Sequence, residues 1–524
     1  MVLLTTTACR DDDGSGYIFK YDIAYNPATL DPQLADDRNS ELIIGNVFMG
    51  LLSLQPDGSL SEGVASDYIV SDDGLKYTFK LRQDVYWMDG REFERQCTAQ
   101  DFVYGFQRLF LPETNAPRAE EYFCIKNSRA VYNNAIKDPS VIGVKAPGDF
   151  ELEITLEYPN IRFLTLLTEP PAMPCNEEFF TSSQGKYGFS AECTPSNGAF
   201  YIKSWDYDPY SITDTNNLIL RRNSKNSAAR QIYPSGLNFF IEEDGQFTDD
   251  FLVGTTSCIA VSDEEAPLIT GKFTCTEYSN ITVGAVFNRT FEPFRHEDFV
   301  KALILLADRN AISEAIGGYT PATAIVPAEV SMLDKSYREL VGSEMTPDYN
   351  ADEARKLFNS VKGDLDRSLF TGARVIVPND TAAEAVSYMM QEWQREFGFY
   401  CVVEVLGETE YATRLSKGDY EIAVTELTGS YNSPAAYMDY FRKSSGLGSF
   451  SSAEFESLMN RAEECESMDE SAELYRQAEQ LLIDRGAFLP LYYKNEYFFT
   501  AEKCTDIFYN SFTKTIDFSQ AKQF

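Results

Sequence analysis

The sequence predicts an α/β fold with two or three domains. Its 524 residues are too many for one simple core, and the 44% of hydrophobic residues is ample for globular folding. Stretches with the alternation of strands are interspersed with stretches of helical periodicity. No repeat or long linker separates them, so we expect several chain crossings between the domains. The predicted strands include residues 77–81, 152–156 and 488–493, and the predicted amphipathic helices include residues 455–462 and 474–482.

The clearest local unit is a strand, a helix and a second strand in the last third of the chain. Residues 375–377 and 402–405 have the β-branched composition of strands. Between them, apolar residues recur on one face of a helix that we expect to end at Gly398. Thr381 and Glu384 predict a capping box at its start. The methionines and the tryptophan on the apolar face are interpreted as core.

Composition and motifs argue against several classes of function. With 81 acidic and 45 basic residues the net charge is −36, which repels nucleic acid and anionic lipid headgroups. The only histidine, His296, is expected in a loop before a helix, so a multi-histidine metal site is excluded. No P-loop, dinucleotide-binding, serine hydrolase or zinc protease motif is present. We therefore expect no catalytic residues, no metal and no cofactor.

The amino terminus resembles the end of a bacterial lipoprotein signal peptide. Residues 1–8 form a short run from apolar to small residues, and Cys9 is followed by a polar tether at 10–16. In such proteins cleavage precedes the cysteine, and a lipid is attached to its sulfur. No basic segment precedes the run, and eight residues are too few for a complete signal. We therefore predict lipidation at Cys9 and a true start upstream of Met1.

The other nine cysteines are widely spaced and include no CxxC pair, so they predict no zinc site. Cys175 and Cys193 bracket one polar loop. We expect these two to form a disulfide.

A block of four fragments near the amino terminus carries the most specific signal. The fragments are 63–65 (GVA), 73–82 (DGLKYTFKLR), 85–90 (VYWMDG) and 98–104 (TAQDFVY). Together they resemble the signature of family 5 bacterial extracellular solute-binding proteins, which include the oligopeptide- and dipeptide-binding proteins of ABC importers. Residues 94–97 are an insertion relative to that signature, and we expect them to lengthen a hairpin or loop. Further fragments similar to the family lie before and after this block, in the order in which the family has them. They are residues 30–32, 45–52, 197–202, 287–309, 349–354, 418–423 and 487–493.

The resemblance implies a two-lobed, periplasmic-binding-protein-like clamshell of class II with an extra inserted subdomain. It assigns residues 17–46, 195–277 and 489–524 to lobe I, residues 47–194 to the inserted subdomain and residues 278–488 to lobe II. The implied protein is a monomer and not an enzyme. It captures peptides between closing lobes and delivers them to a membrane permease, while its lipid anchor holds it at the extracellular face of the membrane.

The resemblance also indicates ligand-binding residues. Peptide-binding relatives hold the α-ammonium group with an aspartate in a loop that reads GSYNSP here, at residues 429–434. Ser430 replaces that aspartate, and a hydroxyl lacks the charge that makes such a hydrogen bond strong. Asp36 or Asp37 is a candidate source of replacement charge. The complete predicted set is Ala35, Asp36, Asp37, Glu426, Leu427, Thr428, Ser430, Tyr431 and Asn432. Trp87, Asp89 and Gly90 are interpreted as residues of the fold.

Several alternatives remain open. Within the same fold the ligand could be an oligosaccharide, a metal chelate or a signalling peptide. A peptidase or glycosidase would need a reactive constellation that no motif indicates. A receptor that does not transport its ligand would share every feature described above.

Overall fold

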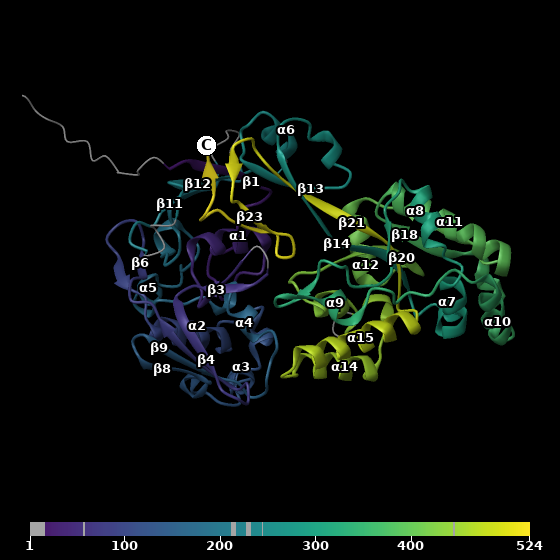
Figure 1. The fold of residues 1–524 in the computed structure, drawn as a ribbon, viewed down its shortest axis with the longest axis horizontal. Helices are drawn as coiled ribbons and strands as arrows, with labels where there is room; N and C mark the ends of the chain where they lie inside the picture. The colour runs from purple at the N-terminus through teal and green to yellow at the C-terminus, as the bar shows by residue number, and fades with distance from the viewer. Residues whose placement is uncertain (1–15, 56–57, 211–215, 227–231, 244, 444–445) are drawn as a thin grey trace, which may run out of the picture.

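The computed structural model describes residues 16–55, 58–210, 216–226, 232–243, 245–443 and 446–524. Figure 1 shows two lobes of mixed helices and strands, so the predicted two-lobed α/β fold is confirmed. Cys9 lies outside the described residues. Within them, no helix is both long and apolar enough to cross a membrane.

The first lobe contains two four-stranded sheets around one continuous hydrophobic core, whose members run from Phe19 to Cys258 and from Phe498 to Ala521. One sheet has the order β1 (Ile18–Ile23), β12 (Gly236–Ile241), β11 (Asn217–Arg222) and β10 (Phe200–Asp206). The other has the order β4 (Ala65–Val70), β5 (Lys76–Leu81), β9 (Glu151–Thr155) and β8 (Val144–Gly148). The helices are α1 (Arg38–Val47), α2 (Ala99–Phe110), α3 (Ser128–Tyr132), α4 (Phe163–Leu166), α5 (Glu177–Ser182) and α6 (Phe247–Leu252).

The inserted residues near position 95 form a hairpin, as the sequence predicts. β6 (Tyr86–Met88) pairs antiparallel with β7 (Glu94–Gln96). Trp87 lies on β6 with 0% of its surface exposed, inside the first-lobe core. This burial supports its interpretation as a residue of the fold.

The main sheet of the second lobe has a hydrophobic core on each face, and it continues through β13 toward the first lobe. Its strand order is β13 (Cys258–Ser262), β21 (Phe488–Thr500), β14 (Thr274–Phe287), β20 (Ile422–Thr428), β18 (Ala373–Val377) and β19 (Cys401–Val405). Val375 and Val377 point into one core and Ile376 into the other, because successive side chains of a strand alternate between faces.

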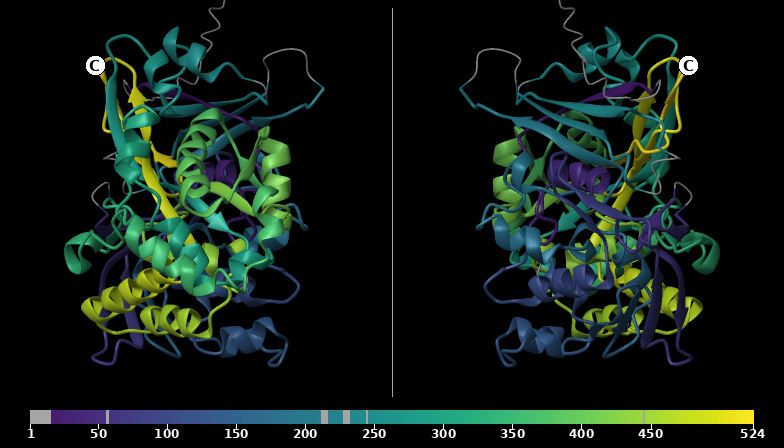
Figure 2. Two further views of the ribbon diagram at one scale, coloured as in Figure 1. Left: turned by 90° about the vertical axis from the view of Figure 1, so that its right-hand side faces the viewer. Right: turned by 90° about the vertical axis from the view of Figure 1, so that its left-hand side faces the viewer.

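Helices cover both cores of the second lobe. One face carries α7 (Glu297–Ile304), α8 (Arg309–Ala315), α10 (Ala351–Val361) and α11 (Asp380–Phe397). The other carries α9 (Tyr337–Val341), α12 (Glu408–Lys417), α13 (Pro434–Met438), α14 (Ala453–Glu463) and α15 (Met468–Asp484). Figure 2 shows the yellow β21 descending from the end of the molecule that holds the C-terminus toward the yellow-green helices α14 and α15.

Two local predictions are wrong. Helix α11 ends at Gly398 as expected, but its cap is Asn379, whose side chain accepts a hydrogen bond from the Ala382 N–H at 2.9 Å. Because Asn379 already fills this role, no capping box is needed at residues 381–384. The predicted disulfide is absent, since Cys175 and Cys193 are both free thiols. The Cys175 Sγ is buried and instead accepts from Arg108 Nη1 at 3.3 Å. His296 directly precedes α7, as predicted.

A buried ion pair holds residues 325–338 against α15. Glu479 has 0% of its surface exposed. Its carboxylate accepts from the Ile325 and Val326 N–H groups, each at 2.9 Å, and from Arg338. The Tyr337 hydroxyl donates to it at 3.2 Å. Every donor comes from this segment, so one side chain fixes its position.

We expect Glu479→Ala to lower the free energy of unfolding by about 3–5 kcal/mol, because it leaves the Arg338 guanidinium buried without its partner. Glu473→Ala is the matched control on the same helix. Its salt bridge to Arg476 is half-exposed, so its loss should cost no more than about 1 kcal/mol. Chemical denaturation of both variants checks this, and equal losses would show that Glu479 has no special role.

Candidate ligand-binding site

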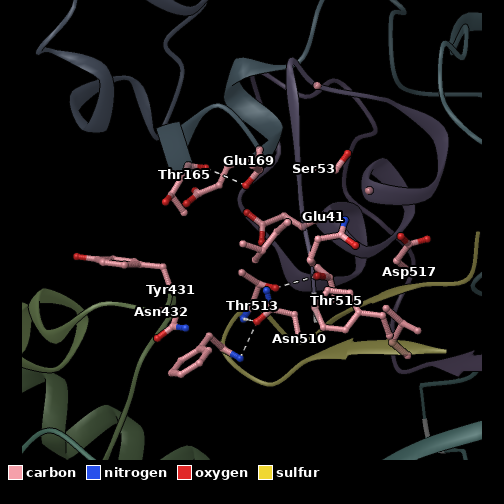
Figure 3. A pocket seen from close by; sticks show the side chains of 18 of the residues that line it. Glu41, Ser53, Thr165, Glu169, Tyr431, Asn432, Asn510, Thr513, Thr515 and Asp517 are labelled. Carbon is pink, nitrogen blue, oxygen red and sulfur yellow. Dashed lines mark hydrogen bonds between the residues drawn. The ribbon is translucent and has the colours of Figure 1, made fainter. Parts of the chain in front are cut away.

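A cavity of about 1630 Å³ lies between the two lobes. Figure 3 shows that its walls come from α1 and the segment around Ser53, from the segment around Glu169, from the carboxy-terminal hairpin and from the loop that follows β20. Pockets for single small molecules typically measure roughly 300–1,000 Å³. This cavity therefore has room for a ligand built of several linked units.

Charged side chains of both signs line the cavity. They are Asp36, Arg38, Glu41, Glu62, Arg82, Arg118, Glu121, Glu169, Asp506, Lys514, Asp517 and Lys522. Such a lining suits a ligand that itself carries both charges or many polar groups.

Three carboxylates surround one guanidinium in the first-lobe wall. Arg118 donates to Glu41 at 2.8 Å, to Glu121 at 2.7 Å and to Glu169. Burial raises the pKa of Glu41, Arg118 lowers it, and the net direction is upward. The cluster carries more negative than positive charge, so it makes this part of the wall electronegative.

The carboxy-terminal hairpin, β23 (Phe508–Asn510) and β24 (Thr515–Asp517), packs in the first-lobe core and supplies hydroxyl groups to the cavity wall. The Asn510 carboxamide oxygen accepts from the Phe512 and Thr513 N–H groups at 3.0 and 3.2 Å, which orders the turn. Thr513 Oγ1 and Thr515 Oγ1 then lie 2.7 Å apart (Figure 3). Beside them, Lys514 pairs with Glu496 at 2.6 Å, and burial lowers the pKa of Lys514.

Five of the nine predicted ligand-binding residues line the cavity. They are Asp36, Thr428, Ser430, Tyr431 and Asn432. The last three belong to one loop, and Figure 3 shows Tyr431 and Asn432 on the second-lobe side, across from Glu169.

The other four predicted residues have structural environments outside the cavity lining. Ala35 and Leu427 are buried, with 1% and 0% of their surfaces exposed. Asp37 caps α1 and accepts from the Ser40 N–H at 2.9 Å. Glu426 pairs with Lys494 at 2.9 Å. Of the two candidate replacement charges, only Asp36 lines the cavity.

Sequence reasoning did not find Arg118, Glu169 or the hydroxyl pair of the carboxy-terminal hairpin. Arg118 and Glu169 are 51 positions apart in the chain and belong to no motif. Only the folded chain brings them to the same wall. In the described part of the chain, no group of three or more His, Cys, Asp or Glu residues is arranged to hold a metal ion.

Comparison with known families places residues 59–449 among the bacterial extracellular solute-binding proteins, family 5. The chain belongs to this family, which makes it a binding protein rather than an enzyme.

Individual relatives match over nearly the whole length. The chain is 25% identical over 494 residues to "Probable deoxycholate-binding periplasmic protein YgiS" of Escherichia coli (strain K12), covering 91% of this chain and 88% of the relative. It is 25% identical over 494 residues to oligopeptide-binding protein OppA of Bacillus subtilis (strain 168), covering 90% and 86%. The substrate-binding domain of an oligopeptide ABC transporter from Bacillus anthracis str. Ames has the same fold, with a TM-score of 0.71, 22% identity and coverage of 97% and 99%.

We expect Arg118→Met to reduce stability at neutral pH by on the order of 2 kcal/mol, because three carboxylates lose their common partner. The folded-state pKa of Glu41, which burial already raises, should then rise further above the unfolded value of roughly 4.3. A carboxyl group whose pKa is raised on folding destabilises the protein at a pH where it is ionised in both the folded and the unfolded state. At a pH below both pKa values it is protonated in both states and no longer destabilises the protein. The loss should therefore shrink as the pH falls toward about 4.

Thermal unfolding of wild type and Arg118→Met, at neutral pH and at about pH 4, measures this loss of stability. Arg95→Met is the control, because its salt bridge to Glu178 is exposed and its removal should matter little at either pH. A loss for Arg118→Met that is independent of pH would contradict the electrostatic explanation.

Proposed function

We propose that this protein is the substrate-binding component of an ABC importer and that it captures peptides in the cavity between its lobes. The observation that carries the proposal is the cavity itself, which combines walls from both lobes, room for several residues and charges of both signs. A peptide with free termini is zwitterionic and matches such a lining. Relatives named as oligopeptide-binding proteins, such as OppA of Bacillus subtilis, support the same ligand class.

The proposed boundaries between lobe I and lobe II approximate the division between the hydrophobic cores. Lobe I comprises residues 17–46, 195–277 and 489–524, the inserted subdomain residues 47–194, and lobe II residues 278–488. In support, the buried residues of the two second-lobe cores lie between 283 and 492. Leu489, Leu491 and Tyr492 pack in a second-lobe core although the proposed boundary places them in lobe I. Closure of these bodies on a ligand shifts a pre-existing balance between open and closed forms.

Backbone pairing is the proposed mode of recognition. The segments near Asp36 and Thr428 face the cavity from opposite lobes, and an extended peptide between them gains main-chain hydrogen bonds without a requirement for particular side chains. Water in the remaining space can satisfy varied side chains. Ser430 supplies no charge, so Asp36 is the proposed partner of the ligand's ammonium group.

Other ligands with the same fold are alternatives. One relative is named for binding deoxycholate, an anionic steroid, and the electronegative wall around Arg118 opposes an anion. An oligosaccharide or a signalling peptide would use the same cavity. A receptor that does not transport its ligand would have the same site. Native mass spectrometry of the purified chain separates these ligand classes.

In that experiment, we expect co-purifying masses that fragment as short peptides. Thermal shift titrations with pentapeptides, deoxycholate and oligosaccharides provide the comparison on ligand-free protein. Stabilisation by deoxycholate or a sugar, with none by peptides, would replace the proposed ligand class and leave the fold and family unchanged.

We expect Asp36→Asn to weaken binding of a peptide with a free amino terminus by about tenfold or more, because a charge-assisted hydrogen bond contributes roughly 1.5–3 kcal/mol. Asp37→Asn is the matched control, since asparagine caps a helix about as well as aspartate. Calorimetric titration of both variants measures the difference. An N-acetylated peptide should bind wild type and Asp36→Asn equally, and an equal loss for both peptides would refute the ammonium contact.

A lipid anchor at Cys9 and delivery to a membrane permease complete the proposal. The supporting observation is the run of residues 1–8 that leads to Cys9 and the polar tether at 10–16. Expressed with a complete bacterial lipoprotein signal, the protein should sediment with membranes, and Cys9→Ala should release it into the soluble fraction. Release of both forms would refute lipidation.

A further inference from the structure

The two lobes touch each other beside the cavity, and the contacts converge on the loop that follows β20. At one contact Arg162, which immediately precedes α4 in the first lobe, places its guanidinium over the ring of Tyr431. The Cζ atom lies 3.5 Å from the ring centroid. Tyr431 lines the cavity, so a first-lobe cation packs directly on an aromatic wall residue of the second lobe.

The lobes also come close to each other at the next residue of the same loop. Gly58 belongs to the connection between β2 (Leu52–Leu54) and β3 (Leu60–Glu62) in the first lobe. A Cβ atom added to Gly58 would lie 3.6 Å from Ser331 Oγ and 3.8 Å from Asn432 Nδ2. Asn432 in turn accepts from the Ser331 N–H at 2.8 Å and donates to Ser331 Oγ at 2.7 Å. The loop is therefore braced on its second-lobe side. The first lobe contacts it at Tyr431 and comes close to it at Asn432.

The surroundings of Arg162 are polar, buried and incompletely hydrogen-bonded. Tyr431 donates its hydroxyl proton to Asp439 at 2.6 Å. Arg162 Nη2, Asp439 Oδ1 and Tyr475 Oη are buried and make no hydrogen bond within the described residues. Burial and then Glu463 raise the pKa of Tyr475, whereas Arg162 lowers it, so these groups share one electrostatic environment. Folded proteins leave few buried polar atoms without hydrogen-bond partners, and here three gather at one contact between the lobes. One of them, Asp439 Oδ1, forms an ion pair with Arg442 Nη1 at 3.6 Å.

This combination of buried polar groups is the one expected of a contact that forms and breaks as the lobes move. When the lobes separate, water can hydrate the guanidinium, the carboxylate and the hydroxyl group, which offsets part of the attraction that is lost. An apolar contact of the same size would favour permanent closure, because its separation exposes hydrophobic surface. The charges are also complementary. Arg162 is the first-lobe cation, and the second lobe presents Asp439 and Glu463 together with Arg442, which pairs with Glu463 at 2.7 Å.

We propose that Arg162 is a positioning residue that holds Tyr431 in the cavity wall and joins the two lobes, so that this contact sets the balance between open and closed forms. The proposal rests on the proposed function only in assuming that ligand occupies this cavity. Loss of the cation frees the Tyr431 ring and removes the attraction across the lobes. The population of the open form then increases. A ligand that binds the closed form must therefore overcome a larger difference in free energy between the two forms.

Small-angle X-ray scattering of the ligand-free full chain tests the lobe contact. We expect Arg162→Ala to give a larger radius of gyration than wild type. Arg162→Lys keeps a cation over the ring and should retain the wild-type value. Arg129→Ala is the matched control, because Arg129 lies over the Phe123 ring within the first lobe, 5.1 Å from its centroid, and should also leave the radius unchanged. A wild-type radius for Arg162→Ala overturns the proposal.

A binding measurement supplies the second readout. With a synthetic mixture of pentapeptides as the probe, Arg162→Ala should bind about tenfold more weakly than wild type, and Arg129→Ala should bind equally well. Equal affinity of wild type and Arg162→Ala also overturns the proposal. If wild type binds no pentapeptide, the proposed ligand class fails, whereas the scattering comparison still decides the role of Arg162.

Discussion

The pairing of β14 with β21 is the constraint on which the two-lobed arrangement depends. These strands have 14 and 13 residues and pair antiparallel from Thr274 with Thr500 to Val286 with Phe488. Their hydrogen bonds fix the register, so the lobes at the two ends cannot slide past each other. A register irregularity follows Tyr278, and such irregularities increase local bending and twist. Relative movement of the lobes is therefore expected as rotation about this strand pair.

The same strand pair determines where the cavity forms. β20 pairs with β14 and ends at Thr428, so its following loop leaves the sheet beside the carboxy-terminal hairpin that comes after β21. Asn280, buried on β14, connects the two parts. Its side chain donates to the Ser511 carbonyl oxygen at 2.9 Å, and its own carbonyl oxygen accepts from the Tyr437 hydroxyl. Opposite walls of the cavity are thus tied to one residue of the connecting strand.

Most of the fold was predictable from the sequence, because strand alternation, helix periodicity and the ordered family fragments depend on local patterns. The cap of α11 was misassigned by two positions because Asn379 and Thr381 both have side chains suited to capping, and only the backbone decides between them. In β20 the alternation of a strand already separates Leu427, in the core, from Glu426, so residue-by-residue alternation could have corrected that part of the predicted site. The cluster around Arg118 depends on long-range packing, which no local pattern encodes.

The charges of the cavity also constrain how selective the site can be. Arg118 already contacts three carboxylates, Lys514 pairs with Glu496 at 2.6 Å, and Lys522 pairs with Asp506 at 3.0 Å. A ligand carboxylate that approaches these cations has to compete with an existing partner, so its net gain is smaller than the isolated contact suggests. Discrimination of ligand carboxylates by these three cations is correspondingly weak. In the proposed mode of recognition, main-chain hydrogen bonds, cavity dimensions and bridging water are the main sources of affinity. These sources would suit a receptor that accepts many sequences rather than one.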